Sequence, residues 1–274
     1  MLTRLGFATA ALDAKLLTQH GLGLDALALA TQENQSVDVA GAERVAALLQ
    51  RRLTGESVAR IIGEREFYGL AFGLNAATLE PRPDTELLVD LALAAMPAGG
   101  RLLDLGTGTG CIPIAMLVHM DGISAVAVDL SAPALAAARD NAARHGVGGR
   151  LILLEGSWFA PLPPQRFDMI VSNPPYITSA VVETLAPEVK DFDPRLALDG
   201  GPDGLAPYRI LAREAAQWLT PDGRMLVEIG HDQGAAVSAL FLEAGFDDVS
   251  VQQDLAGLDR VVIAHHVEHS VRPG

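Results

Sequence analysis

The residues best suited to chemistry lie at 173–176, where the sequence Asn-Pro-Pro-Tyr follows a six-residue run typical of a buried strand. Pro174 and Pro175 remove two backbone donors and stiffen the chain. The Asn173 side-chain oxygen and the proline carbonyls can accept both hydrogens of a planar –NH₂ group, and Tyr176 offers a flat face on which that group can stack. We therefore predict a clamp that holds an –NH₂ group while its nitrogen is methylated. A rigid loop without chemistry is the alternative.

A second candidate site is the glycine-rich turn Gly106-Thr107-Gly108-Thr109-Gly110. It directly follows an apolar run with strand character and precedes a helical segment. Glycines let the backbone approach a ligand closely, and the first amides of a helix are free to bind it. The spacing is G-x-G-x-G and not the G-x-G-x-x-G of dinucleotide sites. We predict that these five residues bind a cofactor, although a tight turn alone would also need glycine.

Two aspartates narrow the choice of cofactor. Asp104 stands just before the glycine turn, which suits a positively charged ligand better than a pyrophosphate. Asp129 ends the next strand run, where a carboxylate can bind both hydroxyls of a ribose. S-adenosyl-L-methionine fits this pair, because it is a nucleoside that carries a sulfonium and an amino acid tail. We predict that it supplies a methyl group to the –NH₂ group held at Asn173. The alternative is that Asp129 only caps the helix that follows.

The residues from 101 onward predict the sheet that positions both sites. Short apolar runs alternate with helical segments, which indicates a mainly parallel, doubly wound α/β sheet. The strand runs are 101–106, 124–130, 150–156, 167–172 and 224–230, followed by 248–255 and 260–266. No helix separates the last two runs, so we expect them to pair antiparallel at the edge of the sheet. Ligands bind such sheets at the carboxyl ends of the strands, where both motifs stand.

The remaining chain predicts two further parts. Apolar residues at helical spacing indicate a small helical domain over 1–62. Residues 63–83 predict a β-hairpin linker with its turn near Asn75. The methyltransferase domain then spans 84–274, and its first helix should begin near Asp84, whose side chain could cap it.

Composition and charge limit the partners. The net charge of −14 repels nucleic acid phosphates unless a local basic patch overrides it. No apolar stretch of about 18 residues lacks glycine or charge, so we expect no membrane span. Cys111 is the only cysteine, which excludes an internal disulfide framework and fits a reducing cytoplasm. We expect a cytoplasmic monomer without a metal, in which Cys111 is a buried packing residue.

Along nearly its whole length, the chain resembles the bacterial protein-(glutamine-N5) methyltransferases that modify peptide chain release factors. The matching stretches are REFYGLAF, EPRPDTELLVD, LLDLGTGTGCIPIA, FDMIVSNPPYI, PRLALDGGPDGL and LVEIGHDQG. Asn-Pro-Pro-Tyr alone is shared with adenine and cytosine amino methyltransferases, whereas EPRPDTELL and ALDGGPDGL are more specific. The resemblance implies a Rossmann-like fold that uses S-adenosyl-L-methionine, and a release factor as the protein substrate.

The resemblance also assigns site residues. Those that should line the cofactor site are Gly106 to Gly110, Asp129, Trp158 and Asn173. Asn173 to Tyr176 should hold the glutamine of a Gly-Gly-Gln loop. The family usually has an acid where this chain has Ser157, and a hydroxyl accepts more weakly from the adenine amino group than a carboxylate does. Glu155 is the alternative acceptor.

The helical domain over 1–62 is the part of the chain that the cofactor fold does not need. A glutamine side chain offers only a few atoms, far too little to select one protein, so specificity must come from remote surface. We therefore interpret residues 1–62 as a docking domain for the protein substrate. A structural cap on the hairpin is the alternative.

Two rival functions remain open. An amino methyltransferase of adenine or cytosine in nucleic acid would use the same chemistry, but the net charge counts against it, and the basic cluster of Arg51, Arg52, Arg60 and Arg65 is short. A non-catalytic module that keeps the cofactor fold is the second rival, although a scaffold has no need for an amide clamp.

Other polar clusters are interpreted without chemistry. Asp191 and Asp193 fall in the long, irregular segment 178–206 and are read as solvated loop residues, with a lid over the substrate as the alternative. The histidines within 265–269 have a spacing compatible with a metal, but a strand end followed by a tail is the preferred interpretation.

Overall fold

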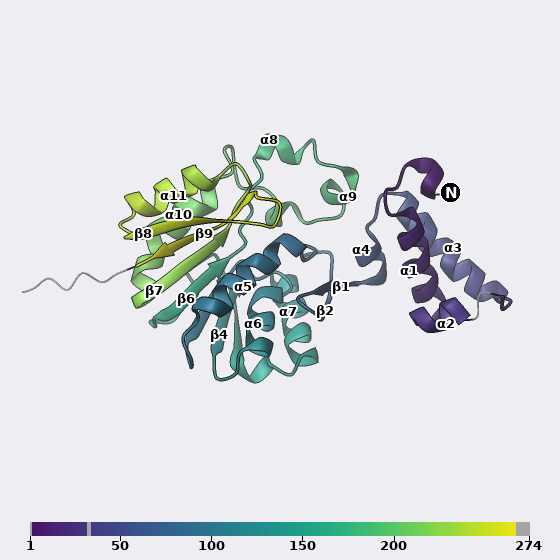
Figure 1. Cartoon of the computed structure of the whole chain (residues 1–274), viewed down its shortest axis with the longest axis horizontal. Helices are drawn as coiled ribbons and strands as arrows, with labels where there is room; N and C mark the ends of the chain where they lie inside the picture. Colours follow the sequence, from purple (N-terminus) through teal and green to yellow (C-terminus); the bar gives the residue numbers. More distant parts are fainter. Residues whose placement is uncertain (1, 32–33, 267–274) are drawn as a thin grey trace, which may run out of the picture.

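The computed structural model describes residues 2–31 and 34–266. A group of N-terminal helices lies beside a larger α/β domain, and the hairpin β1–β2 lies between them (Figure 1). No helix in these two ranges is long and apolar enough to cross a membrane. Of the histidine cluster, only His265 and His266 fall inside the described residues, and the predicted tail lies outside them.

The first 62 residues form short helices around a small core. The elements are η1 (Leu2–Leu5), α1 (Ala10–Leu22), α2 (Ala26–Thr31), α3 (Val39–Leu53) and α4 (Val58–Ile62). The Asp38 side chain caps α3 by accepting from the Gly41 amide at 2.7 Å, and Ser57 caps α4 in the same way. Gly21 lets α1 approach α3 closely, since a Cβ there would lie 2.9 Å from Val45 Cγ2.

A hairpin follows the helices, but its turn is not where the sequence predicted it. The strands β1 (Glu64–Phe67) and β2 (Leu70–Gly73) pair antiparallel, so the turn falls at Tyr68-Gly69 and the predicted turn near Asn75 is wrong. Both turn residues have positive φ, 53° and 74°, as a two-residue hairpin turn requires. Asn75 instead donates from Nδ2 to the Pro133 carbonyl at 2.7 Å and ties the linker to the α/β domain.

The larger α/β domain is built on a seven-stranded sheet. Its strands are β3 (Arg101–Leu105), β4 (Ser124–Asp129), β5 (Leu151–Glu155), β6 (Phe167–Ser172), β7 (Leu219–Glu228), β8 (Asp248–Gln253) and β9 (Asp259–His265). Their order is β5-β4-β3-β6-β7-β9-β8, with β3 to β7 parallel and β9 antiparallel to both of its neighbours. This confirms the predicted doubly wound sheet with an antiparallel edge. The strand order reverses at β3 and β6, which is where such folds bind ligands.

Helices cover both faces of the sheet. They are α5 (Glu86–Ala95), α6 (Cys111–His119), α7 (Ala132–Arg144), α10 (Ala206–Ala215) and α11 (Gly234–Glu243), with the short helices α8 (Ser179–Val182) and α9 (Pro187–Lys190) and the 3-10 turns η2 (Pro83–Thr85), η3 (Gly148–Arg150), η4 (Arg195–Ala197) and η5 (Ala216–Trp218). The predicted cap at Asp84 is wrong. This residue lies inside η2, α5 begins two residues later, and the Asp84 carboxylate pairs with Arg260 at 3.2 Å.

Two apolar clusters, one on each face, hold the helices to the sheet. The first includes Leu88, Leu102 and Met116, and the second includes Leu103, Ile170 and Phe241, all of them fully buried. Neighbouring residues of β3, Leu102 and Leu103, thus enter opposite clusters, because successive side chains of a strand point to opposite faces.

The long segment between β6 and α10 is held by ion pairs to the N-terminal half. Asp193 is almost completely buried, and its two carboxylate oxygens accept from Arg60 at 2.6 Å and from Arg82 at 2.9 Å. Arg52, also buried, bonds Asp13 at 2.7 Å and Glu188 at 2.8 Å. The interpretation of Asp193 as a solvated residue is therefore wrong, because tertiary contacts bring two guanidinium groups to it.

Replacing Asp193 by Ala should destabilise the protein strongly, because it leaves the buried Arg60 guanidinium without its carboxylate partner. A broken buried pair costs about 3 kcal/mol or more. Thermal unfolding should show a melting temperature lower by several degrees. Asp191→Ala is the matched control, since Asp191 lies in the same segment with an exposed side chain. Equal melting temperatures for the two variants would show that the ion cluster contributes nothing.

Candidate active site

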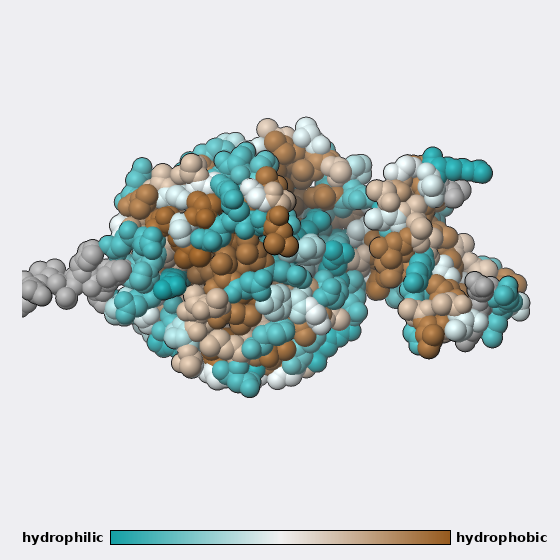
Figure 2. Space-filling view, in the orientation of Figure 1, coloured by the Kyte–Doolittle hydropathy of each residue, from teal (hydrophilic) through white to brown (hydrophobic). Residues whose placement is uncertain are grey.

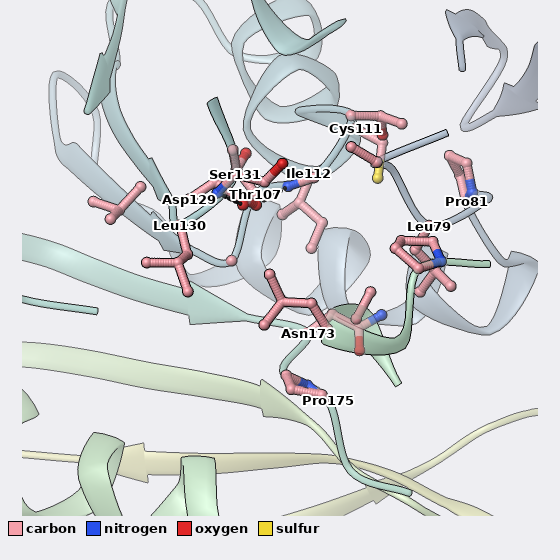
Figure 3. Close-up of a pocket in the computed structure, with 18 of the residues that line it drawn as sticks. Leu79, Pro81, Thr107, Cys111, Ile112, Asp129, Leu130, Ser131, Asn173 and Pro175 are labelled. Atoms are coloured by element: carbon pink, nitrogen blue, oxygen red, sulfur yellow. Dashed lines mark hydrogen bonds between the residues drawn. The ribbon is translucent and has the colours of Figure 1, made fainter. Parts of the chain in front are cut away.

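A cavity opens at the carboxyl ends of β3, β4 and β6. Figure 3 shows Asn173 and Pro175 at the end of a strand on one side, and Asp129 with Leu130 and Ser131 on another. The lining includes Gly106, Thr107, Gly108, Thr109, Asp129, Trp158 and Asn173 from the predicted cofactor site. The tertiary structure therefore brings the glycine turn and the amide corner to one cavity. Gly110, Pro174 and Tyr176 are not among the lining residues.

The glycine turn presents an open backbone surface to the cavity. Gly106 and Gly108 have φ of 79° and 55°, and a Cβ on either would meet nothing within 4 Å. Gly110 differs, because a Cβ there would lie 2.9 Å from Ile114 Cδ1 at the start of α6. The first two glycines leave room for a ligand, whereas the third lies against α6 and has a φ of 78° that favours glycine.

Asp129 orders the turn from the neighbouring strand. Its carboxylate accepts from the Gly108 amide through Oδ2 and from the Ser131 amide through Oδ1, each at 2.8 Å. Helix α7 is capped by the Ser131 hydroxyl and not by Asp129. The alternative role of Asp129 as a simple helix cap is therefore wrong, and the carboxylate remains at the cavity surface.

Asp104 does not line the cavity but lies buried beneath the glycine turn. Neither carboxylate oxygen has a well-formed hydrogen bond to the described residues. Burial raises the pKa of Asp104 to about 7, and the nearby Thr107 hydroxyl offsets only part of that shift. A positive charge in the adjacent cavity would stabilise the ionised form.

The Asn173 amide is oriented by a neighbour from another part of the chain. Its Nδ2 donates to the Thr85 hydroxyl at 3.1 Å, and Thr85 is buried at the end of η2. With the amide nitrogen used in this bond, Oδ1 remains as an acceptor. The stretch EPRPDTELL thus supplies the group that orients the amide, which spacing along the sequence could not show.

The corner after Asn173 is packed against two glycines of ALDGGPDGL. A Cβ on Gly200 would lie 2.7 Å from the Pro175 carbonyl oxygen, and one on Gly204 would strike the Tyr176 carbonyl oxygen. Gln233 donates from Nε2 to that same Tyr176 oxygen at 3.0 Å. Sequence reasoning missed these three residues, although ALDGGPDGL and LVEIGHDQG contain them.

A buried glutamate lies behind the amide. Glu228 ends β7, next to β6, and burial raises its pKa to about 7. Hydrogen bonding from Thr85, the charge of Arg260 and hydrogen bonding from Asn173 oppose this shift. Below about pH 7 the carboxyl therefore holds a proton, and no negative charge stands behind the amide. Burial likewise raises the pKa of Tyr176 to about 12, which keeps the phenol neutral.

The far part of the cavity combines aromatic and small residues. Trp158 lines it with a φ of 49°, a strained conformation for a side chain of this size. Ser157 lines it too, whereas Glu155, the alternative acceptor, is exposed and does not. Cys111 is buried at the cavity wall, and burial raises its thiol pKa to about 12. This agrees with a packing residue and not with a nucleophile.

Apolar residues from two distant segments complete the cavity wall. Leu79 and Pro81 come from the linker after the hairpin, and Pro194 and Leu196 come from the ion-paired segment before α10. Sequence reasoning assigned none of them to the site. Pro81, Pro194 and Leu196 lie in the motif stretches EPRPDTELL and PRLALDGGPDGL, whereas Leu79 lies in no motif stretch.

The residues present fit S-adenosyl-L-methionine. The glycine turn leaves space at its backbone, Asp129 offers carboxylate oxygens, and Asp104 is a buried carboxyl without a well-formed hydrogen bond to any described residue. A ligand with a ribose and a positive charge would use all three features.

Comparisons with known proteins agree with this geometry. Residues 82–189 match the methyltransferase small domain family, and residues 1–63 match the PrmC N-terminal domain family. The chain is 45% identical over 263 residues to the release factor glutamine methyltransferase of Agrobacterium fabrum, covering 94% of this chain and 91% of the relative. The corresponding Geobacter sulfurreducens protein is 42% identical, with 94% and 90% covered.

The chain belongs to the release factor glutamine methyltransferase family. Membership confirms the resemblance drawn from the six motif stretches. A methyltransferase from Pyrococcus furiosus shares the fold, with a TM-score of 0.56 at 16% identity over 81% of this chain and 99% of that one. Members of this family are methyltransferases, and S-adenosyl-L-methionine is the methyl donor that this activity requires.

Replacing Glu228 by Gln should change how stability depends on pH. The native carboxyl releases its proton near pH 4.5 in the unfolded chain but only near pH 7 in the folded one. The native protein therefore loses stability relative to the variant as pH rises between these values, and the loss persists above them. In denaturant titrations, the unfolding free energy of the native protein should fall by up to ~3 kcal/mol relative to that of Glu228→Gln across this pH range.

Glu155→Gln is the control for this experiment, because Glu155 ends β5 of the same sheet with an exposed side chain. The difference in unfolding free energy between Glu155→Gln and the native protein should stay nearly constant over the same pH range. A Glu228→Gln difference that is equally flat would show that the carboxyl is not held protonated by burial.

Proposed function

We propose that the protein transfers a methyl group from S-adenosyl-L-methionine to the side-chain amide nitrogen of a glutamine in a peptide chain release factor. The relatives in Agrobacterium fabrum and Geobacter sulfurreducens are named for this activity. The observation that carries the proposal is the placement of the Asn173 amide. Its nitrogen donates a hydrogen bond to Thr85, and Asn173 lines the same cavity as the glycine turn.

On the cofactor side, the glycine turn and Asp129 would hold the nucleoside. Asp129 would accept from the ribose hydroxyls, and Trp158 and Ser157 would contact the remaining part of the cavity. When bound, S-adenosyl-L-methionine supplies a methyl group attached to a positively charged sulfur. Asp104, buried beside the turn, would favour that positive charge in its ionised form.

On the substrate side, the corner from Asn173 to Tyr176 would clamp the glutamine amide. Asn173 Oδ1 and a carbonyl of Pro174 or Pro175 would accept its two hydrogens, and neither proline carbonyl accepts a hydrogen bond from a described residue. An amide nitrogen is a poor nucleophile because its lone pair is delocalised. Hydrogen bonds to both hydrogens favour rehybridisation as the N–C bond forms, and the methylated nitrogen would then release one of these hydrogens as a proton to solvent water.

Contacts of the basic cluster argue against nucleic acid as the substrate. Arg51 pairs with Glu56, and Arg65 with Glu80. Arg52 and Arg60 are buried in the ion pairs that hold the segment before α10. These side chains are committed to carboxylates of the same chain, so they do not form a free surface for phosphates.

Two substitutions should separate cofactor binding from the amide clamp. Asp129→Ala should weaken S-adenosyl-L-methionine binding about tenfold or more, because a charge-assisted contact is lost. Asn173→Ala should lower turnover on a release factor about a hundredfold while cofactor affinity changes less. Calorimetry and a methyl-transfer assay measure the two effects. Near-normal turnover of the Asn173 variant, or unchanged affinity of the Asp129 variant, would remove that residue from its role.

We further infer that residues 1–62 dock the release factor. Apolar residues stand exposed on this small domain, which holds five of the thirteen large apolar side chains exposed in the described chain: Leu5, Leu12, Leu27, Val37 and Val39. Figure 2 shows apolar atoms at the surface of these helices. These side chains are available for contact with a protein partner.

The double substitution Leu27→Ser and Val39→Ser tests docking without disturbing Arg52 and Arg60. Transfer to intact release factor should fall about tenfold, and transfer to a short glutamine peptide should not change. Ile152→Ser, an exposed position on β5, is the control. Unchanged transfer to the intact factor, or equal losses on both substrates, would leave the domain as a structural cap.

A further inference from the structure

The turn between β8 and β9 carries an apolar side chain that is fully exposed to solvent. Leu255 is fully exposed, more so than any other large apolar side chain in the described chain, and Leu258 is 44% exposed. A single exposed leucine is ordinary on a protein surface. This one differs in the rigidity of its turn and in its position relative to the cavity.

The turn is held in one conformation by Asp254. Its Oδ1 accepts from the amides of Ala256 at 2.9 Å and Leu258 at 3.0 Å, and its own amide donates to the Leu258 carbonyl at 2.9 Å. Its Oδ2 pairs with Arg260 at 3.1 Å. Leu255 is therefore presented on a hydrogen-bonded backbone. The one carboxylate of the turn, that of Asp254, is already paired with Arg260 of β9.

The strand directions place this turn at the end of the sheet where the parallel strands have their carboxyl ends and where the cavity opens. Strand β9 is antiparallel to β7, so it begins where β7 ends, near Glu228. Figure 1 shows the turn at the same end of the sheet as the segment with α8 and α9. Arg260 also pairs with Asp84 at 3.2 Å, and Asp84 directly precedes Thr85, which orients Asn173.

The same residues act electrostatically on the clamp. Arg260 lowers and Asp84 raises the pKa of Tyr176, although burial has the largest effect on that phenol. The cation that fixes the β8–β9 turn therefore lies close enough to the amide corner to influence it. A protein whose glutamine reaches Asn173 approaches the end of the sheet at which β7 ends and β9 begins, and the turn lies at that same end.

We propose that the turn Asp254–Leu258 is a contact surface for the protein that carries the acceptor glutamine. The partner surface would be apolar and uncharged, since the turn offers leucine side chains and keeps its charges paired within the chain. This inference rests on the proposed function and adds a contact beside the active site to the docking domain at residues 1–62. Two separate contacts would hold the substrate protein more firmly than either one alone.

Leu255→Ser tests the contact in the full-length protein. For intact release factor, kcat/KM should fall about fivefold to tenfold, as expected for an apolar side chain at the centre of a contact. For a short glutamine peptide, which does not reach the turn, kcat/KM should not change. Leu255→Met should retain most of the native activity, because it keeps an apolar side chain of similar volume.

Leu242→Ser is the matched control, since Leu242 is an exposed leucine of the same domain on α11. It should leave both substrates unaffected. Equal kcat/KM for the native protein and Leu255→Ser on intact factor, or equal losses on factor and peptide, would overturn the contact. A native protein that methylates neither substrate would instead overturn the proposed function, and with it this inference.

Discussion

The pairing of β3 with β6 is the constraint on which the site depends. The two strands run parallel at the point where the strand order reverses, so their carboxyl ends lie side by side. A buried hydrogen bond from Ser172 Oγ to the Leu105 carbonyl, 2.7 Å long, joins the last residues of the two strands. The glycine turn and Asn173 follow at once. Two motifs more than sixty residues apart therefore share one cavity, and a methyl donor and an acceptor amide can meet there.

Around this junction, rigidity comes from backbone packing as much as from side-chain bonds. Gly200 and Gly204 allow one loop to lie directly against the carbonyls of Pro175 and Tyr176, and Gln233 bonds to that loop and to the corner. A clamp for a weak nucleophile needs such support, because positioning supplies much of its effect. The two glycines thus support the corner through close backbone packing, without side-chain chemistry of their own.

The N-terminal helices are joined physically to the cavity wall. Asp193 accepts from Arg60 of α4 and from Arg82 of the linker, and the next residue, Pro194, lines the cavity. The proposed docking domain is therefore linked to the wall of the pocket in which the glutamine would react. The Arg60 guanidinium is buried in this cluster, so its charge is satisfied within the chain.

The sequence by itself determined the sheet, its antiparallel edge and the two motifs that meet at the cavity, because alternating apolar runs and glycine or proline punctuation are local signals. It misplaced the hairpin turn, since a left-handed Tyr68 has no strong local signature. Only the tertiary structure decided the neighbours of each polar group: Thr85 beside Asn173, two arginines around Asp193, and Asp104 beneath the cavity surface. Burial and pairing depend on residues far away in the chain, so the spacing of residues along the sequence does not specify them.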